Sequence, residues 1–238
     1  MGRAFEYRKE KKFKRWAGMA KAFTKIGREI AIAVKEGGPD PAYNPRLRLA
    51  MHNAKTANMP KANVEAAIKR ASSKEAENYE EILYEGYGPH GVAFMVETAT
   101  DNTNRTVANL RLIFSKGGGN LGNSGEVDYM FNHRGQFKVK ADSVNMEELE
   151  LELIDHGLED VDTEEDMLVL YSAFEDFGSL QKALEEQGIE VDSAGLVRIP
   201  THTKELTDAQ VDDVINLIDK LEDDDDVTQV FHNMDMTE

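Results

Sequence analysis

The chain has 238 residues, no cysteine, 40% hydrophobic residues and a formal net charge of −17. This composition is typical of a folded protein with two or three small domains, and the lack of cysteine excludes disulfides, thiol nucleophiles and thiolate metal sites. No window approaches the roughly 18 apolar residues of a membrane span, and the start lacks the apolar run of a secretory signal, so we expect a cytoplasmic protein without a membrane partner.

Charge is distributed very unevenly along the chain. The first 75 residues carry 18 Lys and Arg against 7 Asp and Glu, a net charge of +11, whereas the remaining 163 carry 10 against 38, a net charge of −28. A concentrated basic segment attracts polyanions such as DNA and RNA, and an acidic body repels them. The sequence therefore predicts a nucleic-acid partner at the N-terminal end, with a merely solvated basic surface as the alternative.

The first residues interleave cations with aromatic side chains. The candidate nucleic-acid-binding residues of this segment are Lys11, Lys12, Lys14, Arg15 and Trp16. Cations that pair with phosphates, placed beside rings that stack on unpaired bases, are typical of single-strand binding. The alternative is a helix end that packs on the domain through Phe13 and Trp16. The binding and the packing interpretations are compatible if the segment becomes ordered only when it binds.

Residues 21–35 are predicted to form an amphipathic helix, because apolar residues recur there at intervals of three and four. Lys21, Lys25 and Arg28 fall on the opposite face, together with Lys35. Cations separated in this way from the apolar face form a stripe that can face phosphates while the helix packs on its neighbours.

Two further helices are expected before residue 75. Asn44 is a good N-cap with a proline at the first helical position, and a break follows at residues 58–60 before a third apolar-periodic stretch. The candidate phosphate-contacting residues on these two helices are Arg46, Arg48, Lys55 and Lys61. The three helices together predict a basic helical domain.

After residue 75 the pattern becomes that of strands at 82–84 and 92–96, followed by a helix at 104–116. Gly117, Gly119 and Gly122 have the spacing of a dinucleotide fingerprint, but a helix precedes them where the fingerprint needs a strand, and Asn123 occupies the phosphate-loop lysine position. We therefore predict a helix C-cap followed by a mobile loop that could still touch RNA through its backbone.

Residues 129–200 predict a compact α+β unit, with strands at 136–140, 167–171 and 195–199 and helices at 146–156 and 179–187. The first sheet has only one clear helix to cover one of its faces. We expect a last helix at 208–221 and a strand at 227–232 to return to this sheet and complete the covered face. The predicted fold class is α+β, with an N-terminal three-helix domain followed by two α+β domains. The expected limits are 1–75, a discontinuous middle domain of 76–130 plus 205–238, and an insertion of 131–204.

Sites for chemistry are not evident. The four carboxylates of residues 223–226 are expected to form a solvated turn, because the ligands of a cation site are usually spaced. The histidines lack zinc-ligand spacing and no G-x-S-x-G elbow occurs. We predict no enzymatic activity, no metal, no cofactor and no small-molecule substrate.

Several motifs occur in an order that closely resembles the YebC family. They are Phe23-Thr24-Lys25-Ile26-Gly27-Arg28-Glu29-Ile30, Gly37-Gly38-Pro39-Asp40-Pro41, Asn44-Pro45-Arg46-Leu47-Arg48, Asn58-Met59-Pro60-Lys61, Tyr84-Glu85-Gly86-Tyr87-Gly88-Pro89, Glu97-Thr98-Ala99-Thr100-Asp101-Asn102 and Gly118-Gly119-Asn120-Leu121-Gly122. Several motifs in one order are far more specific than any single one. The opening, residues 5–12, departs from the Lys-Trp-Ala-Asn-Ile-Lys segment of many members, and residues 72–78 lack a glycine-rich linker.

The resemblance implies one helical and two α+β domains. Members are commonly labelled transcriptional regulators of the YebC/PmpR type, and relatives include a mitochondrial translational activator and proteins linked to the ribosome and to stalling at proline-rich stretches. The resemblance thus leaves the partner open between DNA and ribosomal RNA or the ribosome.

The sequence as a whole predicts a non-enzymatic nucleic-acid-binding regulator of gene expression. Structured RNA or the ribosome is slightly favoured over DNA, because no helix shows several base-reading side chains and an acidic body would be repelled by a second pass of duplex. The alternative is a protein-interaction adaptor that acts through its acidic α+β domains.

Overall fold

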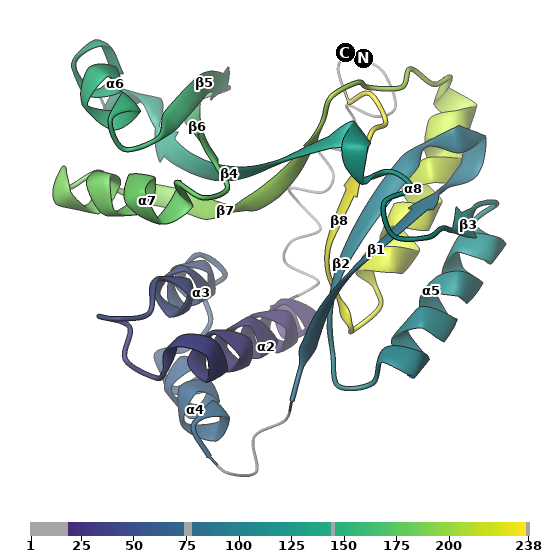
Figure 1. Ribbon diagram of the computed structural model, residues 1–238, viewed down its shortest axis with the longest axis horizontal. Helices are drawn as coiled ribbons and strands as arrows, with labels where there is room; N and C mark the ends of the chain where they lie inside the picture. Colours follow the sequence, from purple (N-terminus) through teal and green to yellow (C-terminus); the bar gives the residue numbers. More distant parts are fainter. Residues whose placement is uncertain (1–18, 74–77, 144–145, 237–238) are drawn as a thin grey trace.

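The computed structural model describes residues 19–73, 78–143 and 146–236. Its N-terminal part is a bundle of three helices, α2 (Met19–Gly37), α3 (Pro45–Thr56) and α4 (Lys61–Ala71), around a small apolar core (Figure 1). Asn44 caps α3 by accepting a hydrogen bond from the Leu47 amide, and its side-chain amide donates to the Ala33 carbonyl oxygen at 2.7 Å. One buried side chain therefore begins α3 and fixes it against α2.

The middle domain is built on a four-stranded sheet in the order β3-β1-β2-β8. Its strands are β1 (Glu80–Tyr87), β2 (Ala93–Thr100), β3 (Asn120–Leu121) and β8 (Val227–His232). Two helices, α5 (Thr103–Lys116) and α8 (Asp208–Glu222), cover one face (Figure 1). Alternation along β2 sends Phe94 and Val96 into the core beneath these helices and Ala93 and Met95 into a smaller cluster on the other face.

The chain leaves this domain and returns to it by paired strands. β4 (Phe131–Lys140) and β7 (Val191–Pro200) are antiparallel, and Phe131 at the start of β4 lies opposite Pro200 at the end of β7. The two ends of the inserted domain are thus adjacent, as a tolerated insertion requires. β8 and α8 then complete the first sheet and its core.

The inserted domain has its own sheet in the order β5-β6-β4-β7, which adds β5 (Leu158–Glu164) and β6 (Met167–Ala173). Helices α6 (Met146–Ile154) and α7 (Phe177–Glu186) pack against it around Phe137, Leu170 and Leu184. The predicted fold class, a three-helix domain followed by two α+β domains with the middle one discontinuous, is confirmed. The exact domain limits stay a prediction.

Two strands, β3 and β5, were not predicted, and several predicted strands are longer than expected. β5 is an exposed, mostly acidic edge strand with little apolar alternation, and β4 extends the predicted strand 136–140 back to Phe131. The third difference lies in the glycine-rich segment, where a mobile loop was expected after α5. Asn120 and Leu121 instead pair with β1, and a Cβ at Gly119 would lie 2.2 Å from the Tyr87 carbonyl oxygen, so glycine permits this close strand approach.

Candidate nucleic-acid interface and the central pocket

Seven of the twelve predicted nucleic-acid-binding residues belong to the described structure. They are Lys21, Lys25, Arg28, Arg46, Arg48, Lys55 and Lys61. Lys11, Lys12, Lys14, Arg15 and Trp16 lie outside the described residues.

The stripe of Lys21, Lys25 and Arg28 on α2 faces the turn between α8 and β8. The Lys21 ammonium lies 2.6 Å from an Asp223 carboxylate oxygen, and the Lys25 ammonium donates to the Glu222 carbonyl oxygen at 2.9 Å. The hydrogen bond to Asp223 raises the pKa of Lys21, whereas burial lowers the pKa of Lys25. These cations therefore join the helical domain to the middle domain.

Arg28 ends in the most buried part of this junction. Its guanidinium donates to the Ala99 carbonyl oxygen and to Asp226, each at 3.0 Å, and lies 5.3 Å from the centre of the Tyr79 ring. The Arg28 side chain is 14% exposed, so it is mostly removed from solvent.

Asp226 corrects the expectation of a solvated turn at residues 223–226. Its side chain is 4% exposed and accepts hydrogen bonds from Arg28, from Arg105 at 2.9 Å and from the Thr106 hydroxyl at 2.8 Å. Burial by itself would raise its pKa, but the hydrogen bonds from Thr106 and Arg105 and the two nearby guanidinium charges outweigh burial and lower it. A run of acidic residues in the sequence does not show that Asp226 is buried while Asp223 and Asp225 are exposed.

Arg46 and Arg48 are also engaged within the protein. Arg46 forms ion pairs with Glu36, at 2.7 Å, and with Glu81 of β1. Arg48 donates to the Pro41 carbonyl oxygen at 2.8 Å and lies 3.8 Å from Glu185 of α7. Both side chains thus hold the helical domain in place as well as contributing positive charge.

Lys55 and Lys61 are the more available cations of the predicted set. Lys55 is exposed at the end of α3, and the Lys61 side chain is 90% exposed at the start of α4, 3.8 Å from Glu65. Lys69 and Arg70, which were not in the predicted set, add two exposed cations at the end of α4.

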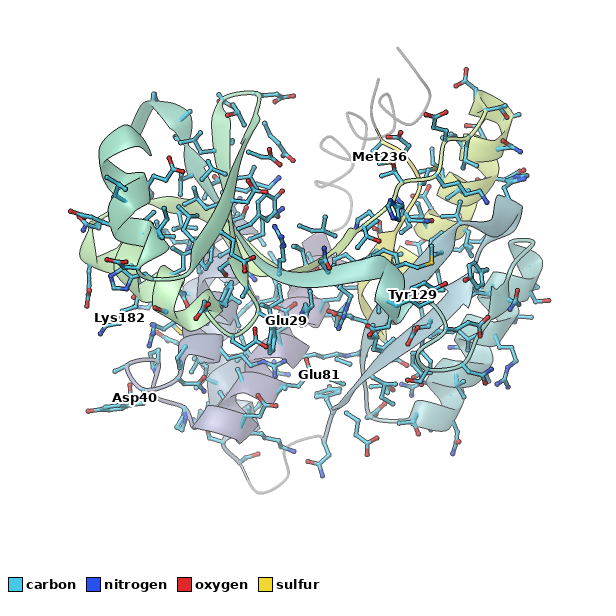
Figure 2. The ribbon with its side chains drawn as sticks, turned by 45° about the horizontal axis from the view of Figure 1, so that its top comes forward. Glu29, Asp40, Glu81, Tyr129, Lys182 and Met236 are labelled. Atoms are coloured by element: carbon cyan, nitrogen blue, oxygen red, sulfur yellow. The ribbon has the colours of Figure 1, made fainter. Side chains whose placement is uncertain are left out.

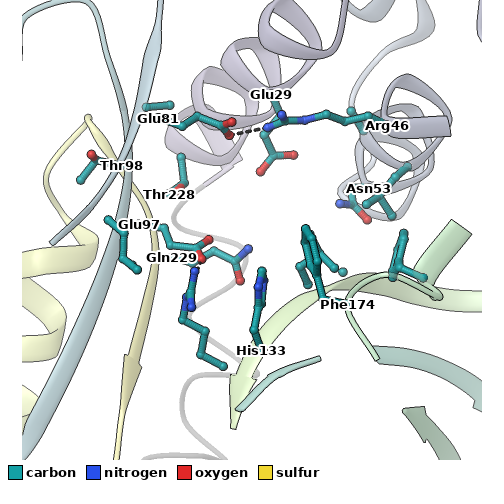
Figure 3. A pocket seen from close by; sticks show the side chains of 18 of the residues that line it. Glu29, Arg46, Asn53, Glu81, Glu97, Thr98, His133, Phe174, Thr228 and Gln229 are labelled. Atoms are coloured by element: carbon teal, nitrogen blue, oxygen red, sulfur yellow. Dashed lines mark hydrogen bonds and ion pairs between the residues drawn. The ribbon is translucent and has the colours of Figure 1, made fainter. Parts of the chain in front are cut away.

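A pocket of about 620 Å³ lies where the three domains meet, and no pattern in the sequence predicted it. Glu29 and Arg46 line it from the helical domain, Glu97 from the middle domain, and His133 and Phe174 from the inserted domain (Figure 3). Figure 2 shows Glu29 and Glu81 at the centre of the molecule, whereas Asp40 and Lys182 lie on its outside. The site forms only when distant segments fold together, which is why spacing in the sequence could not reveal it.

Glu29 is the acidic side chain of this pocket for which the described residues supply no ion pair. Among the described residues no group donates a hydrogen bond to its carboxyl, and burial raises its pKa to about 7. The one signal in the sequence is that Glu29 is the sole acid within the basic helix predicted at 21–35. By contrast, the Glu97 carboxylate accepts a hydrogen bond from Arg198 at 3.0 Å.

An aromatic pair forms the wall contributed by the inserted domain. The rings of His133 and Phe174 stack with their centres 4.4 Å apart and their planes at 25°. Burial, and then the charge of Arg198, lowers the pKa of His133, so its ring is neutral at neutral pH. Phe174 remains 45% exposed, which leaves a flat apolar surface at the pocket.

The part of the chain that the structure describes contains no group of three or more His, Cys, Asp or Glu arranged to hold a metal ion. None of its helices combines the length and apolar character needed to cross a membrane.

Comparison with known proteins places the whole chain in one family. Residues 3–74 match the TACO1/YebC protein N-terminal domain, and residues 79–234 match the TACO1/YebC second and third domain. A protein of Flavobacterium johnsoniae is 57% identical over 98% of this chain and 99% of its own length, and one of Parabacteroides distasonis is 56% identical over 98% and 97%. Both are named "Probable transcriptional regulatory protein".

A solved structure agrees with these matches. The crystal structure of a conserved hypothetical protein from Aquifex aeolicus is similar to this chain with a TM-score of 0.81 and 42% identity, covering 92% of this chain and 91% of that one. Since the family models together span both the helical and the α+β domains, the chain belongs to the TACO1/YebC family.

Proposed function

We propose that this protein is a non-enzymatic, cytoplasmic regulator of gene expression that binds nucleic acid through its basic N-terminal domain. The observation that carries the proposal is the segregation of charge, 18 Lys and Arg against 7 Asp and Glu in the first 75 residues. The names of its relatives support a regulatory role. Nothing in the geometry of the described residues favours catalysis over binding.

The binding surface proposed here combines the predicted cations with those exposed on the helical domain. Lys55, Lys61, Lys69 and Arg70 are exposed on α3 and α4, where phosphates can reach them. Lys21, Lys25 and Arg28 already form hydrogen bonds or ion pairs with the α8–β8 turn. They therefore contribute to nucleic-acid binding mainly through long-range attraction of the phosphates.

Structured RNA, including ribosomal RNA, is the partner we favour over duplex DNA. A recognition helix must enter the major groove with a free face. The cationic side of α2 is covered by the middle domain, and α3 contacts the inserted domain through His52 and Thr56, which both lie near the Asp192 carbonyl oxygen. Phosphate contacts from exposed lysines need no such groove, and they suit RNA of irregular shape.

The test is the double charge reversal Lys55→Glu with Lys61→Glu, compared with Lys182→Glu on α7. Lys182 is 71% exposed and pairs with Glu186 at 3.4 Å, so it matches the pairing of Lys61 with Glu65 on a different domain. Affinity for a ribosomal RNA fragment and for duplex DNA is measured across a salt series. The double reversal is expected to reduce the slope of log affinity against log salt by nearly 0.9 per lost contact on duplex and about 0.7 on single strands.

An unchanged affinity and slope in the double variant would refute the proposal and turn attention to an adaptor that uses its acidic domains. Crosslinking in cells, followed by sequencing of the recovered nucleic acid, separates the two partners. Ribosomal RNA recovered with wild type and lost with the double variant would identify a translation factor, whereas discrete promoter DNA would identify a transcription factor.

A further inference from the structure

The central pocket has an aromatic ring, Phe174, that the described residues leave partly uncovered. Phe174 is 45% exposed although its ring already stacks on His133. Exposed aromatic rings beside a positively charged domain are what proteins use to stack on unpaired bases. The neutral His133 ring behind Phe174 stiffens this platform without adding charge.

Hydrogen-bonding groups face this platform from the other two domains (Figure 3). The Glu29 carboxyl, to which none of the described residues donates a hydrogen bond, is an acceptor, and when protonated it is also a donor. The amides of Asn53 and Gln229 line the same pocket. Arg46 and Arg198 also line it, each paired with a glutamate.

Charge decides which part of a nucleotide could enter. Glu29, Glu81 and Glu97 oppose the two guanidinium groups of Arg46 and Arg198, so the pocket does not attract a phosphate. A nucleobase is neutral and planar and carries donors and acceptors along one edge. A flexible alkylammonium group would satisfy Glu29 but would leave the aromatic platform without a planar partner.

The position of the pocket connects it to the basic surface. Asn53 lines the pocket, and Lys55, two residues further along α3, is exposed. Two residues turn an α-helix by about 200°, so Lys55 lies on the side of α3 away from the pocket, and a strand that contacts Lys55 has to cross α3 to place a base in the pocket. We infer that the pocket between the three domains receives a single unpaired base of an RNA strand, which stacks on Phe174 and hydrogen bonds to Glu29. This inference rests on the proposed nucleic-acid function.

Two eight-nucleotide RNA strands of equal charge test the inference. One is fully abasic and the other carries a single adenine at its centre. Wild type is expected to bind the one-base strand roughly five-fold or more tightly than the abasic strand, since stacking on one aromatic side chain contributes about that much. Phe174→Leu retains apolar volume but loses the flat ring, so it should bind both strands with the affinity of wild type for the abasic strand.

Two controls keep the experiment specific. Tyr129→Leu changes a ring that is 75% exposed outside the pocket and should preserve the preference for the one-base strand. Glu29→Gln keeps the shape of the side chain and an acceptor but cannot carry charge, so it should keep the preference for the one-base strand that stacking provides but change the size of that preference. Binding of the same strands made with deoxyribose, and competition by free AMP, distinguish a base in RNA from a base in DNA or in a free nucleotide.

Equal binding of both strands by wild type, with normal salt dependence, would overturn the pocket and leave the proposed function standing. A preference that survives in Phe174→Leu would also overturn it. No salt-dependent binding of any strand or duplex would overturn both. Displacement by AMP at the dissociation constant of the one-base strand would overturn the RNA source, because the site would then belong to a free nucleotide.

Discussion

Replacing Asp226 with asparagine is expected to loosen the junction between the helical and middle domains. The Asp226 side chain is 4% exposed and receives Arg28 from α2 together with Arg105 and Thr106 from α5. Removing one charge of a buried pair costs about 3 to 5 kcal/mol. We take the lower value, about 3 kcal/mol, because Arg105 is 46% exposed and water can replace part of its lost contact.

The matched control is Asp225→Asn, because the Asp225 side chain is exposed while its backbone carbonyl oxygen keeps its bond to Arg28. Urea unfolding followed by circular dichroism at pH 7 should show the full loss for Asp226→Asn and a change within about 0.5 kcal/mol for the control. Equal losses in the two variants would refute the reasoning.

The pH dependence of this loss has a definite sign. The pKa of Asp226 is lower in the folded protein than its ordinary value near 3.8. The carboxylate therefore stabilises the fold above the pKa of the unfolded chain, and this contribution is lost as the pH falls through the lowered value. The difference between wild type and Asp226→Asn should accordingly shrink in acid.

Three other predictions concern the partly buried Glu29 and the buried side chains of Asn44 and Glu85. The pKa of Glu29 is about 7 in the folded protein against 4.5 ordinarily, so the free energy of unfolding of wild type should fall by up to roughly 3 kcal/mol as the pH rises from 4.5 to 7. In urea titrations at several pH values, Glu29→Gln should make the free energy of unfolding less dependent on pH over this range. Asn44→Ala removes the α3 cap and its bond to Ala33, so it should lower stability by about 1 to 2 kcal/mol in thermal unfolding. Glu85→Ala orphans three backbone N–H groups of residues 125–128 and should speed their hydrogen exchange.

The sequence predicted most of the architecture because apolar periodicity and caps are local signals. Asn44 and Pro45 begin α3 as expected, and the α8–β8 return to the first sheet followed from the need to cover its face. β5 escaped prediction because an acidic edge strand is specified by its pairing with β6 and not by its own alternation.

The candidate site was harder to predict, because charge in a sequence does not show what the charge faces. Lys21 and Arg28 have helical positions suited to phosphates, yet their partners are Asp223 and Asp226, about 200 residues away. The pocket at Glu29 escaped for the same reason, since its walls come from all three domains.

These contacts change how charge reversal on α2 has to be interpreted. Reversing Lys21, Lys25 and Arg28 would place three carboxylates against the acidic α8–β8 turn, including the buried Asp226. Like charges at such distances repel strongly, so weaker nucleic-acid binding by that variant would follow from a displaced helical domain even if none of the three cations touched phosphate. Exposed Lys55 and Lys61 avoid this ambiguity, because no hydrogen bond or ion pair recorded for the described residues joins either of them to the middle domain. A change in salt slope in their variants therefore reports on phosphate contacts and not on domain docking.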